Sequence, residues 1–369
     1  MSVLFEDDRG YFICCKTYLN QIYESCIDEN SVKKKLKIRD VYFQIKTPYL
    51  MNSAAKQKSL CLQTEVSLKT AKKKFKGKKE VCSFSKIDSI IKEVTNSLIE
   101  TAYKLHLLDC SEIDASDWFE NNSRSREASK EIPEMCFQGD FIYHNSCNIP
   151  VMKVLRNNKY ILPPNSTFHL CDISNISCLK GTQYDLVVLD PPWENKSVKR
   201  KKGYPMLTCE SLRDLPIEEF LNPGCLIIVW VTNNEKQINF VKDELFVQWK
   251  VASSAIWHWS KVTQKGHFIH PINSHHKKPY ENILLGRVAF DERSCNAYSF
   301  PALKSNKVIV SVPSSIHSHK PPLMEILKPY IPKQSKCLEL FARYLLPGWT
   351  SVGNEVLKLQ HIKLFEELD

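Results

Sequence analysis

The sequence of 369 residues contains no long hydrophobic run. No uninterrupted apolar stretch approaches the length that crosses a bilayer. Residues 1–11 carry acidic side chains where a secretory signal would have a basic end and an apolar centre. These two absences argue against a membrane-spanning or secreted protein, so we expect it to remain inside the cell without a membrane partner.

Two other signals are missing. None of the fourteen cysteines forms a Cys-x-x-Cys pair, the spacing typical of zinc sites. We therefore predict no metal, and we expect reduced thiols that pack as small apolar side chains. None of the ten glycines belongs to a Gly-x-Gly-x-x-Gly turn, which marks many dinucleotide and methyl-donor sites. The usual glycine-rich signal for a cofactor is therefore absent.

The sequence has a concentrated positive charge. Lysine and arginine number 51 against 41 acidic residues, a formal net charge of +10, and dense basic runs occupy residues 33–35, 72–79 and 199–202. A basic run is often only a solvated surface. Three such runs favour a polyanionic partner, namely nucleic acid. The two N-terminal runs are also typical of nuclear import signals, so we expect the nucleus, with the cytoplasm as the alternative.

The first 165 residues divide into two regions. Residues 1–80 alternate short apolar pieces with polar and basic stretches, which predicts a basic accessory region that is weakly folded and partly flexible. Residues 81–165 form a predicted helical middle region, because apolar residues recur at helical spacing between positions 87 and 108. Within it, residues 117–134 are polar and indicate a loop or linker.

Residues 166–369 have a different pattern of apolar residues and form the predicted catalytic domain. Apolar strands are predicted at residues 185–189, 225–231, 280–285, 307–312 and 337–341, and helices at residues 212–221, 234–245 and 322–327. This alternation predicts an α/β fold with a mostly parallel sheet and helices on both faces. Ligands of such sheets bind beyond the carboxyl ends of the strands.

A tetrapeptide follows the first of these strands at that edge: Asp190, Pro191, Pro192 and Trp193. The chemistry of this tetrapeptide suits the activation of an adenine amine. Such an amine is a poor nucleophile because its lone pair is delocalised into the ring. The Asp190 carboxylate and the Pro191 carbonyl can each accept one amine hydrogen, and the prolines stiffen the turn that presents them. Trp193 can stack on a base, a contact worth roughly 1–3 kcal/mol. The alternative is an Asp-Pro turn followed by a core tryptophan.

Two further segments are candidates for nucleic-acid contact. Lys199, Arg200, Lys201 and Lys202 follow the tetrapeptide closely and suit phosphates on either side of a target nucleotide, unless the loop is merely solvated. Residues 257–278 combine tryptophans, histidines and lysines. Their histidine spacing fits no compact set of metal ligands, so this segment is either a second nucleic-acid surface or ordinary structure.

The order of motifs resembles the messenger-RNA adenosine methyltransferase (MT-A70) family. The resemblance covers residues 167–369 and is carried by the tetrapeptide and by the segments at residues 171–173, 230–233, 318–321, 338–343, 348–349 and 353–355. The sequence of residues 337–343 and 347–355 looks most similar to the branch called methyltransferase-like protein four. The resemblance implies a Rossmann-like class I methyltransferase domain and S-adenosylmethionine as the cofactor, with the catalytic motif ahead of the donor-binding strand.

Site residues follow from the resemblance position by position. Asp172 and Ile173 match the adenine end of the donor, Asp190 its ammonium group and Lys320 its carboxylate. Glu339, Phe341 and Arg343 belong to the donor-binding turn, and Arg343, Asn354 and Glu355 match positions around the ribose and base. Tyr204 matches a mobile gate over the target base. The sequence departs from the family at Tyr344, Leu345 and Leu346, where polar residues usually bond the ribose hydroxyls.

The resemblance implies adenine N(6)-methylation of RNA, including an adenosine already methylated on its ribose in a spliceosomal small nuclear RNA. DNA is the alternative substrate. A protein of another class, a catalytically silent nucleic-acid-binding subunit, is a further alternative, although its tetrapeptide would not need to keep the acid and the tryptophan. A monomer and a protein with a partner subunit both fit the sequence.

Overall fold

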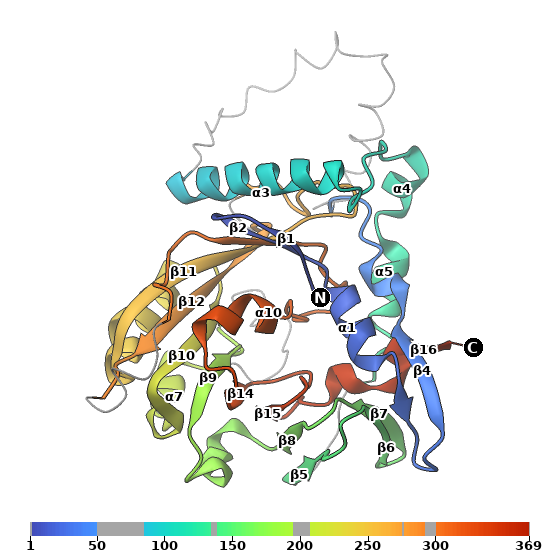
Figure 1. Ribbon diagram of the computed structural model, residues 1–369. Coiled ribbons are helices and arrows are strands. Elements are labelled where there is room, and N and C mark those ends of the chain that lie inside the picture. Colours follow the sequence, from blue (N-terminus) through green and yellow to red (C-terminus); the bar gives the residue numbers. More distant parts are fainter. Residues whose placement is uncertain are drawn as a thin grey trace.

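An eleven-stranded sheet runs through the molecule, and a five-stranded sheet lies beside it (Figure 1). The computed structural model describes residues 2–49, 85–133, 139–194, 207–274, 277–291 and 300–368. None of the helices within these ranges combines the length and apolar character of a bilayer-spanning segment.

The centre of the large sheet is parallel. The adjacent strands are β8 (Thr167–Leu170), β15 (Trp349–Val352), β14 (Cys337–Leu340), β9 (Tyr184–Leu189) and β10 (Leu221–Val231), and each pair of neighbours is parallel. β9 is buried along nearly its whole length, as expected of a strand covered on both faces. The predicted α/β class with a mostly parallel sheet is confirmed.

Mixed pairings extend this centre in both directions. Beyond β10 follow β12 (Tyr280–Val288) and β11 (Val251–Lys261), both paired in antiparallel fashion, and then β13 (Val308–Ser311), which is parallel to β11. Beyond β8 lies the edge strand β5 (Phe141–His144). All five strands predicted from apolar runs are present, whereas β5, β8, β11 and β15 were not predicted.

Helices cover both faces of the sheet. Val187 and Leu189 pack beneath a layer formed by α7 (Cys209–Arg213), η4 (Ile217–Phe220), α8 (Glu235–Asn239), the π-helix η5 (Phe240–Leu245) and α9 (Phe246–Gln248). Leu186 and Val188 face the opposite side, where α10 (Met324–Leu327) and η6 (Lys328–Tyr330) pack. The predicted helix at residues 212–221 is interrupted between α7 and η4, where Pro216 lacks an amide donor.

The expectation of a weakly folded N-terminal region is wrong for residues 2–49. β1 (Val3–Glu6) and β2 (Gly10–Ile13) form a hairpin, and β2 adds a parallel strand to β13. α1 (Cys15–Tyr23), β3 (Cys26–Ile27), β4 (Lys33–Ile38) and η1 (Asp40–Phe43) follow. The basic run at residues 33–35 lies in β4, which pairs with the C-terminal strand β16 (Phe365–Leu368). The second run, residues 72–79, lies outside the described residues.

The amphipathic helix of the middle region is confirmed as α3 (Lys86–Lys104). Its buried face includes Val94, Leu98 and Ala102 and packs on Phe12 of β2 and on Val310 of β13. Figure 1 shows α3 lying across this end of the large sheet. A capping box formed by Ser85 and Asp88 begins the helix.

The rest of the middle region differs from the prediction. The predicted linker at residues 117–134 contains α4 (Ala115–Glu120) and α5 (Ser123–Ala128), and the side chains of Asn121 and Asn122 between them bond residues 46–48. β6 (Val151–Leu155) and β7 (Asn158–Leu162) complete the small sheet, whose order is β16-β4-β3-β6-β7. η7 (Lys358–Gln360) and η8 (Ile362–Leu364) connect the two sheets before β16. As domain limits, the three sequence regions stay a prediction.

Candidate functional site

The five central strands run in one direction, so their carboxyl ends meet at one edge of the sheet. We call this the carboxyl edge. Asp172 follows β8, Asp190 follows β9, Phe341 follows β14 and Gly353 follows β15. The structure therefore places the tetrapeptide and the predicted donor-binding residues at the same edge, although they come from distant parts of the chain.

The tetrapeptide is a rigid turn. The Trp193 amide donates to the Pro191 carbonyl at 2.8 Å, and the Leu207 amide donates to the Pro192 carbonyl at 3.1 Å. The Trp193 indole N–H donates to the Trp230 carbonyl at 2.7 Å. These bonds fix the turn against the end of β10. Because a carbonyl oxygen has two lone pairs, the Pro191 carbonyl can still accept a hydrogen from a substrate amine.

The ring of Trp193 is largely covered. Its exposed fraction is 9%, and it packs in the same hydrophobic cluster as Leu212 and Phe240. In this structure the ring is therefore a core tryptophan that anchors the turn. That it stacks on a target base stays a prediction.

Asp190 lies between two cations. Its Oδ1 is 3.3 Å from the Lys320 ammonium, and its Oδ2 is 3.1 Å from Nη1 of Arg343. The residue is 8% exposed. A carboxylate bonded on both oxygens in a buried position has a fixed orientation, so the acid of the tetrapeptide is positioned before any substrate binds.

These contacts belong to a longer line of alternating charges, which we call the charge chain. Lys320 also bonds Glu281 at 2.6 Å, and Arg343 Nε bonds Glu355 at 3.1 Å. Lys261 pairs with Glu281, and Lys358 pairs with Glu355. In order, the charge chain is Lys261, Glu281, Lys320, Asp190, Arg343, Glu355 and Lys358.

The charge chain controls the ionisation of its members. Burial acts to raise the pKa of Glu281, but Lys261 and Lys320 outweigh it and hold that pKa well below its ordinary value. Burial acts to lower the pKa of Lys320, but Asp190 and Glu281 raise it above its ordinary value. For Glu355 burial is likewise outweighed, by Lys358 and Arg343, and its pKa is lowered. All three groups are therefore charged at neutral pH.

Glu339 differs from these acids. It is 3% exposed, and its Oε2 has no hydrogen-bond partner among the described residues. Burial, and then the negative charge of Asp190, raise the pKa of Glu339 to about 8. Its register partner on β15 is Ser351, whose buried hydroxyl also lacks a partner within the described part of the chain. The carboxyl edge thus contains a neutral acid and two unsatisfied buried polar atoms.

The backbone is tight where β14 and β15 end. Phe341 has a positive φ of 62°, which a bulky residue rarely adopts. A Cβ atom on Gly353 would lie 2.9 Å from the Ala342 carbonyl oxygen, so only glycine fits this crossing. The Gly353 amide donates to the His169 carbonyl at 3.1 Å, which ties the end of β15 to that of β8.

The remaining predicted donor residues lie toward solvent. Asp172 is exposed and caps η3 (Ile173–Leu179) by accepting from the Ser174 amide at 2.9 Å, and bonds to Ser174 lower its pKa. Ile173 is half-buried and Asn354 is exposed. Leu345 and Leu346, where the family usually has polar residues, are buried in hydrophobic clusters. Ribose contacts from those two positions are therefore excluded in this structure.

The structure describes only some of the residues predicted to contact nucleic acid. Lys199, Arg200, Lys201, Lys202 and Tyr204 lie outside the described residues. Trp257, His258 and Trp259 are each no more than 2% exposed and lie in β11, so this part of residues 257–278 is core and not a nucleic-acid surface. Among the described residues no group of three or more His, Cys, Asp or Glu is arranged to hold a metal ion.

Sequence reasoning missed Lys261, Glu281 and Lys358. Lys261 is the last residue of β11, and Glu281 is near the start of β12, its antiparallel neighbour. The parallel-strand rule did not point to the ends of antiparallel strands. The only available signal was an isolated charge at the end of an apolar strand, which becomes informative when the strand order is known.

Comparisons with known proteins give a family match that spans this site. Residues 184–355 match the MT-A70 family model. The matched range contains the tetrapeptide, Glu281, Lys320, Glu339 and Glu355. This segment is similar to an MT-A70 domain.

Three relatives are similar to this chain over more than half of its length. The human N(6)-adenine-specific methyltransferase METTL4 is 46% identical over 230 residues, 61% of this chain and 48% of the relative. The Caenorhabditis elegans DNA N6-methyl methyltransferase is 38% identical over 215 residues, 56% of each chain. The Pyricularia oryzae N6-methyladenosine RNA methyltransferase MTA1 is 35% identical over 214 residues, 55% of each chain. The matches span about half the length of these curated relatives.

Proposed function

We propose that this protein transfers the methyl group of S-adenosylmethionine to the exocyclic N6 amine of an adenine in nucleic acid. The observation that carries the proposal is the Asp190 carboxylate, fixed at the end of β9 between Lys320 and Arg343 and followed by a rigid Pro-Pro-Trp turn. The presence of this turn in the segment similar to an MT-A70 domain, and the name of the human relative, support it.

The charges at the carboxyl edge fit the donor. The methionine end of S-adenosylmethionine has one ammonium and one carboxylate group, which suit Asp190 and Lys320 respectively. When bound, the donor supplies a methyl group activated by a positive sulfur. Asp190 and Lys320 are paired with each other in this structure. Binding therefore exchanges one internal ion pair for two pairs with the donor, and Glu281 holds Lys320 in place during the exchange.

The same residues fit the acceptor amine. Asp190 and the Pro191 carbonyl are two acceptors on adjacent residues, and each can take one hydrogen of an amino group. Two acceptors in fixed positions turn the nitrogen lone pair away from the ring and toward the donor. Asp190 contributes negative charge where the amine becomes positive, which is the main way such a site lowers the barrier.

RNA is the substrate that we propose, with DNA as the alternative. The names of the relatives include an RNA and a DNA methyltransferase. The net charge of +10 and the basic run beside the tetrapeptide favour a polyanion. Because a base inside a duplex cannot reach such a turn, we propose a single-stranded or flipped adenosine. We further propose a nuclear protein in which this chain supplies the catalytic subunit, either as a monomer or with a partner subunit.

The test uses methyl transfer from labelled donor to matched RNA and DNA oligonucleotides, with and without a ribose methyl group on the target adenosine. Asp190→Asn removes the fixed charge, and we expect the rate to fall by about 10²–10³-fold. Asp185→Asn is the matched control because Asp185 lies at the opposite end of β9, where it bonds Asn222 and the Lys336 amide.

Three outcomes separate the alternatives. Transfer to RNA that is lost only in Asp190→Asn supports the proposal. Preferred transfer to DNA replaces the RNA assignment. Nucleic-acid binding without turnover on any adenine substrate would identify a silent binding subunit and overturn the enzymatic assignment.

A further inference from the structure

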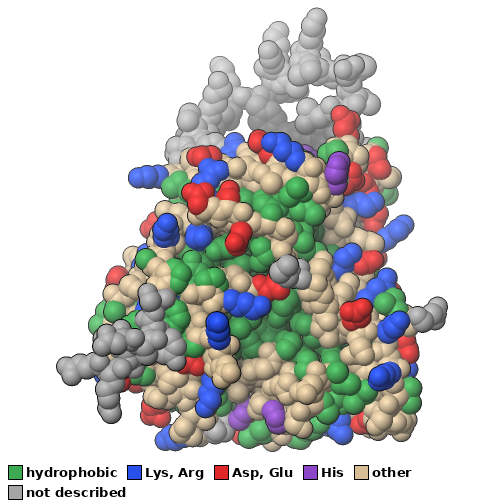
Figure 2. Space-filling model, in the orientation of Figure 1, with side chains coloured by type: hydrophobic (Ala, Val, Ile, Leu, Met, Phe, Trp, Pro, Cys, Tyr) green, Lys and Arg blue, Asp and Glu red, His purple; other side chains and the backbone are tan. Residues whose placement is uncertain are grey.

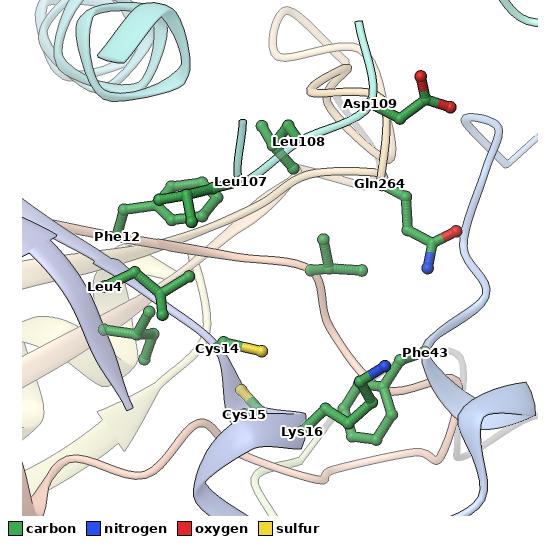
Figure 3. A pocket seen from close by; sticks show the side chains of 12 residues that line it. Leu4, Phe12, Cys14, Cys15, Lys16, Phe43, Leu107, Leu108, Asp109 and Gln264 are labelled. Carbon is green, nitrogen blue, oxygen red and sulfur yellow. The ribbon is translucent and has the colours of Figure 1, made fainter. Parts of the chain in front are cut away.

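A cavity of about 350 Å³ lies between the β1–β2 hairpin, the start of α1 and the segment that follows α3 (Figure 3). Most of its wall is apolar. Its apolar side chains are those of Leu4, Phe12, Ile13, Phe43, Leu107, Leu108 and Val312. A volume of this size is within the range of small-molecule sites.

The polar groups around the cavity favour an uncharged ligand. The Lys16 ammonium is paired with Asp40 at 3.0 Å. The Asp109 carboxylate points away from the cavity in Figure 3 and lies 3.3 Å from the Lys265 ammonium. Both charges of the lining are thus compensated. The Gln264 side chain extends into the cavity, and within the described residues its carboxamide makes no hydrogen bond, so it can pair with one donor or acceptor of a ligand.

One wall of the cavity reaches the charge chain through stacked rings. Phe43 packs against His319, with 6.3 Å between ring centroids. His319 is 8% exposed and immediately precedes Lys320. On its other side His319 packs against Tyr344 at 5.9 Å. A displacement of Phe43 therefore acts on the backbone that positions Lys320.

A second wall reaches the same lysine. The Cys15 thiol contacts the Ser311 hydroxyl at 4.0 Å, and that hydroxyl accepts the Trp259 indole N–H at 2.8 Å. Trp259 packs edge to face on Trp230 at 5.8 Å, and the Lys320 ammonium lies 4.8 Å from the Trp230 ring centroid. Buried contacts thus join the cavity to Lys320 along two separate routes.

We propose that this cavity binds an uncharged, largely apolar small molecule that pairs with Gln264, and that its occupancy changes the affinity of the carboxyl edge for the methyl donor. The second half rests on the proposed function. A nucleotide is disfavoured as the occupant because its phosphate needs an unpaired cation, and Lys16, the one cation among the described lining residues, is already paired with Asp40. Coupling arises because a close-packed interior transmits a displacement from wall to wall.

The experiment uses the full chain and indole, a flat uncharged molecule with one N–H donor. Thermal melts with increasing indole measure occupancy, and calorimetric titration of S-adenosylmethionine with and without indole measures coupling. Leu108→Trp fills the cavity. Leu105→Trp is the matched control, because Leu105 is 51% exposed and does not line the cavity. Gln264→Leu removes the pairing group and keeps the volume.

We expect indole to raise the melting temperature of the wild type and of Leu105→Trp but not of Leu108→Trp, and to bind several-fold more weakly to Gln264→Leu. We expect indole to change the dissociation constant of the donor at least threefold in the wild type. An equal thermal response in Leu108→Trp, or none in the wild type, overturns the site. An unchanged donor affinity at saturating indole overturns the coupling. If no variant binds the donor at all, the proposed function fails, and the indole melts still decide the site.

Discussion

Asp190 and Glu339 are two acids at the ends of neighbouring strands whose side chains have very different surroundings. Asp190 has a cation on each oxygen. Glu339 is fully buried with one oxygen unpaired. One carboxyl group is therefore suited to hold a positive group, and the other can donate a hydrogen bond at neutral pH. In many active sites, two acids take different roles because their surroundings differ.

The Glu339 environment predicts a pH dependence of stability. Its folded-state pKa of about 8 lies above the ordinary 4.5, so the unfolded chain binds fewer protons between these values. Stability therefore falls as pH rises from 4.5 to 8. Glu339→Gln keeps the shape of the neutral side chain but cannot ionise. The unfolding free energy of this variant relative to the wild type should therefore increase from pH 4.5 to 8 and remain constant above pH 8. Urea denaturation from pH 5 to 9 measures the difference.

The control for this prediction is Glu366→Gln on the exposed face of β16. Curves for Glu339→Gln and wild type that run parallel at all pH values would show that Glu339 is already ionised in the folded protein.

Lys320 is predicted to matter for both stability and donor binding. Lys320→Ala leaves Asp190 and Glu281 without a shared buried partner, which should cost about 3–5 kcal/mol of unfolding free energy. The donor should bind at least tenfold more weakly, because one charge-assisted contact is lost. Calorimetric titration and urea denaturation measure the two effects.

Lys328→Ala serves as the matched control, since Lys328 is exposed on η6. Equal donor affinity in the two variants would contradict the role assigned to Lys320.

At the scale of elements, α3 is predicted to support the site from outside the segment that matches the MT-A70 family model. Asp88 closes the capping box and also bonds Lys278 at 2.8 Å and the Tyr280 hydroxyl at 2.9 Å. Tyr280 precedes Glu281 of the charge chain. Asp88→Ala should lower the unfolding free energy by about 2–4 kcal/mol, because a helix cap and a partner of a largely buried lysine are lost together.

Urea denaturation tests this prediction, and Glu93→Ala, on the exposed face of the same helix, should change stability by less than about 0.5 kcal/mol. A loss in Asp88→Ala no larger than that of the control would remove Asp88 from the support of the site.

The elements predicted from sequence were those with a strong local signal. β9, β10, β12, β13 and β14 are continuous apolar runs, and α3 has a clear helical period. β4 was missed because its six residues include four lysines, although Leu36 and Ile38 are buried. Two of its lysines, Lys34 and Lys37, pair with Glu367 and Glu366 of β16. That pairing joins opposite ends of the described chain, so no local window of sequence contains it.

The site follows the same rule. The tetrapeptide was predictable because the chemistry of its acid and carbonyl is local. Glu281 was not, because it becomes part of the site only when β12 lies beside β10. For Trp193 the sequence left a core ring as the alternative and could not decide for it, since the residues that cover the ring, such as Leu212 and Phe240, come from helices farther along the chain.

At the scale of the whole molecule, charge is the main signal for the substrate. On the face shown in Figure 2, the Lys and Arg side chains of the described residues are scattered among acidic ones. We therefore expect the run at residues 199–202 to make the main phosphate contacts. Replacing these four cations with glutamine should reduce the salt dependence of single-stranded RNA binding by a slope of up to about 3, near 0.7 per phosphate contact.

Fluorescence anisotropy at several salt concentrations measures this slope. The control is the same replacement at four exposed lysines elsewhere, Lys159, Lys180, Lys304 and Lys328. An unchanged slope in the first variant would move the RNA contacts to another surface.

The strand order also bears on whether the segment that matches the family model could fold without the rest of the chain. The match to the family model begins at Tyr184, yet β15 inside that range needs β8 as its neighbour, and β13 needs β2. Separated from residues 2–170, the matched segment would have two unpaired strand edges and would expose the apolar surface that α3 covers. The active-site residues therefore depend on a folded unit that is larger than the matched segment. Transplanting the active turn into another protein would require most of the sheet to move with it.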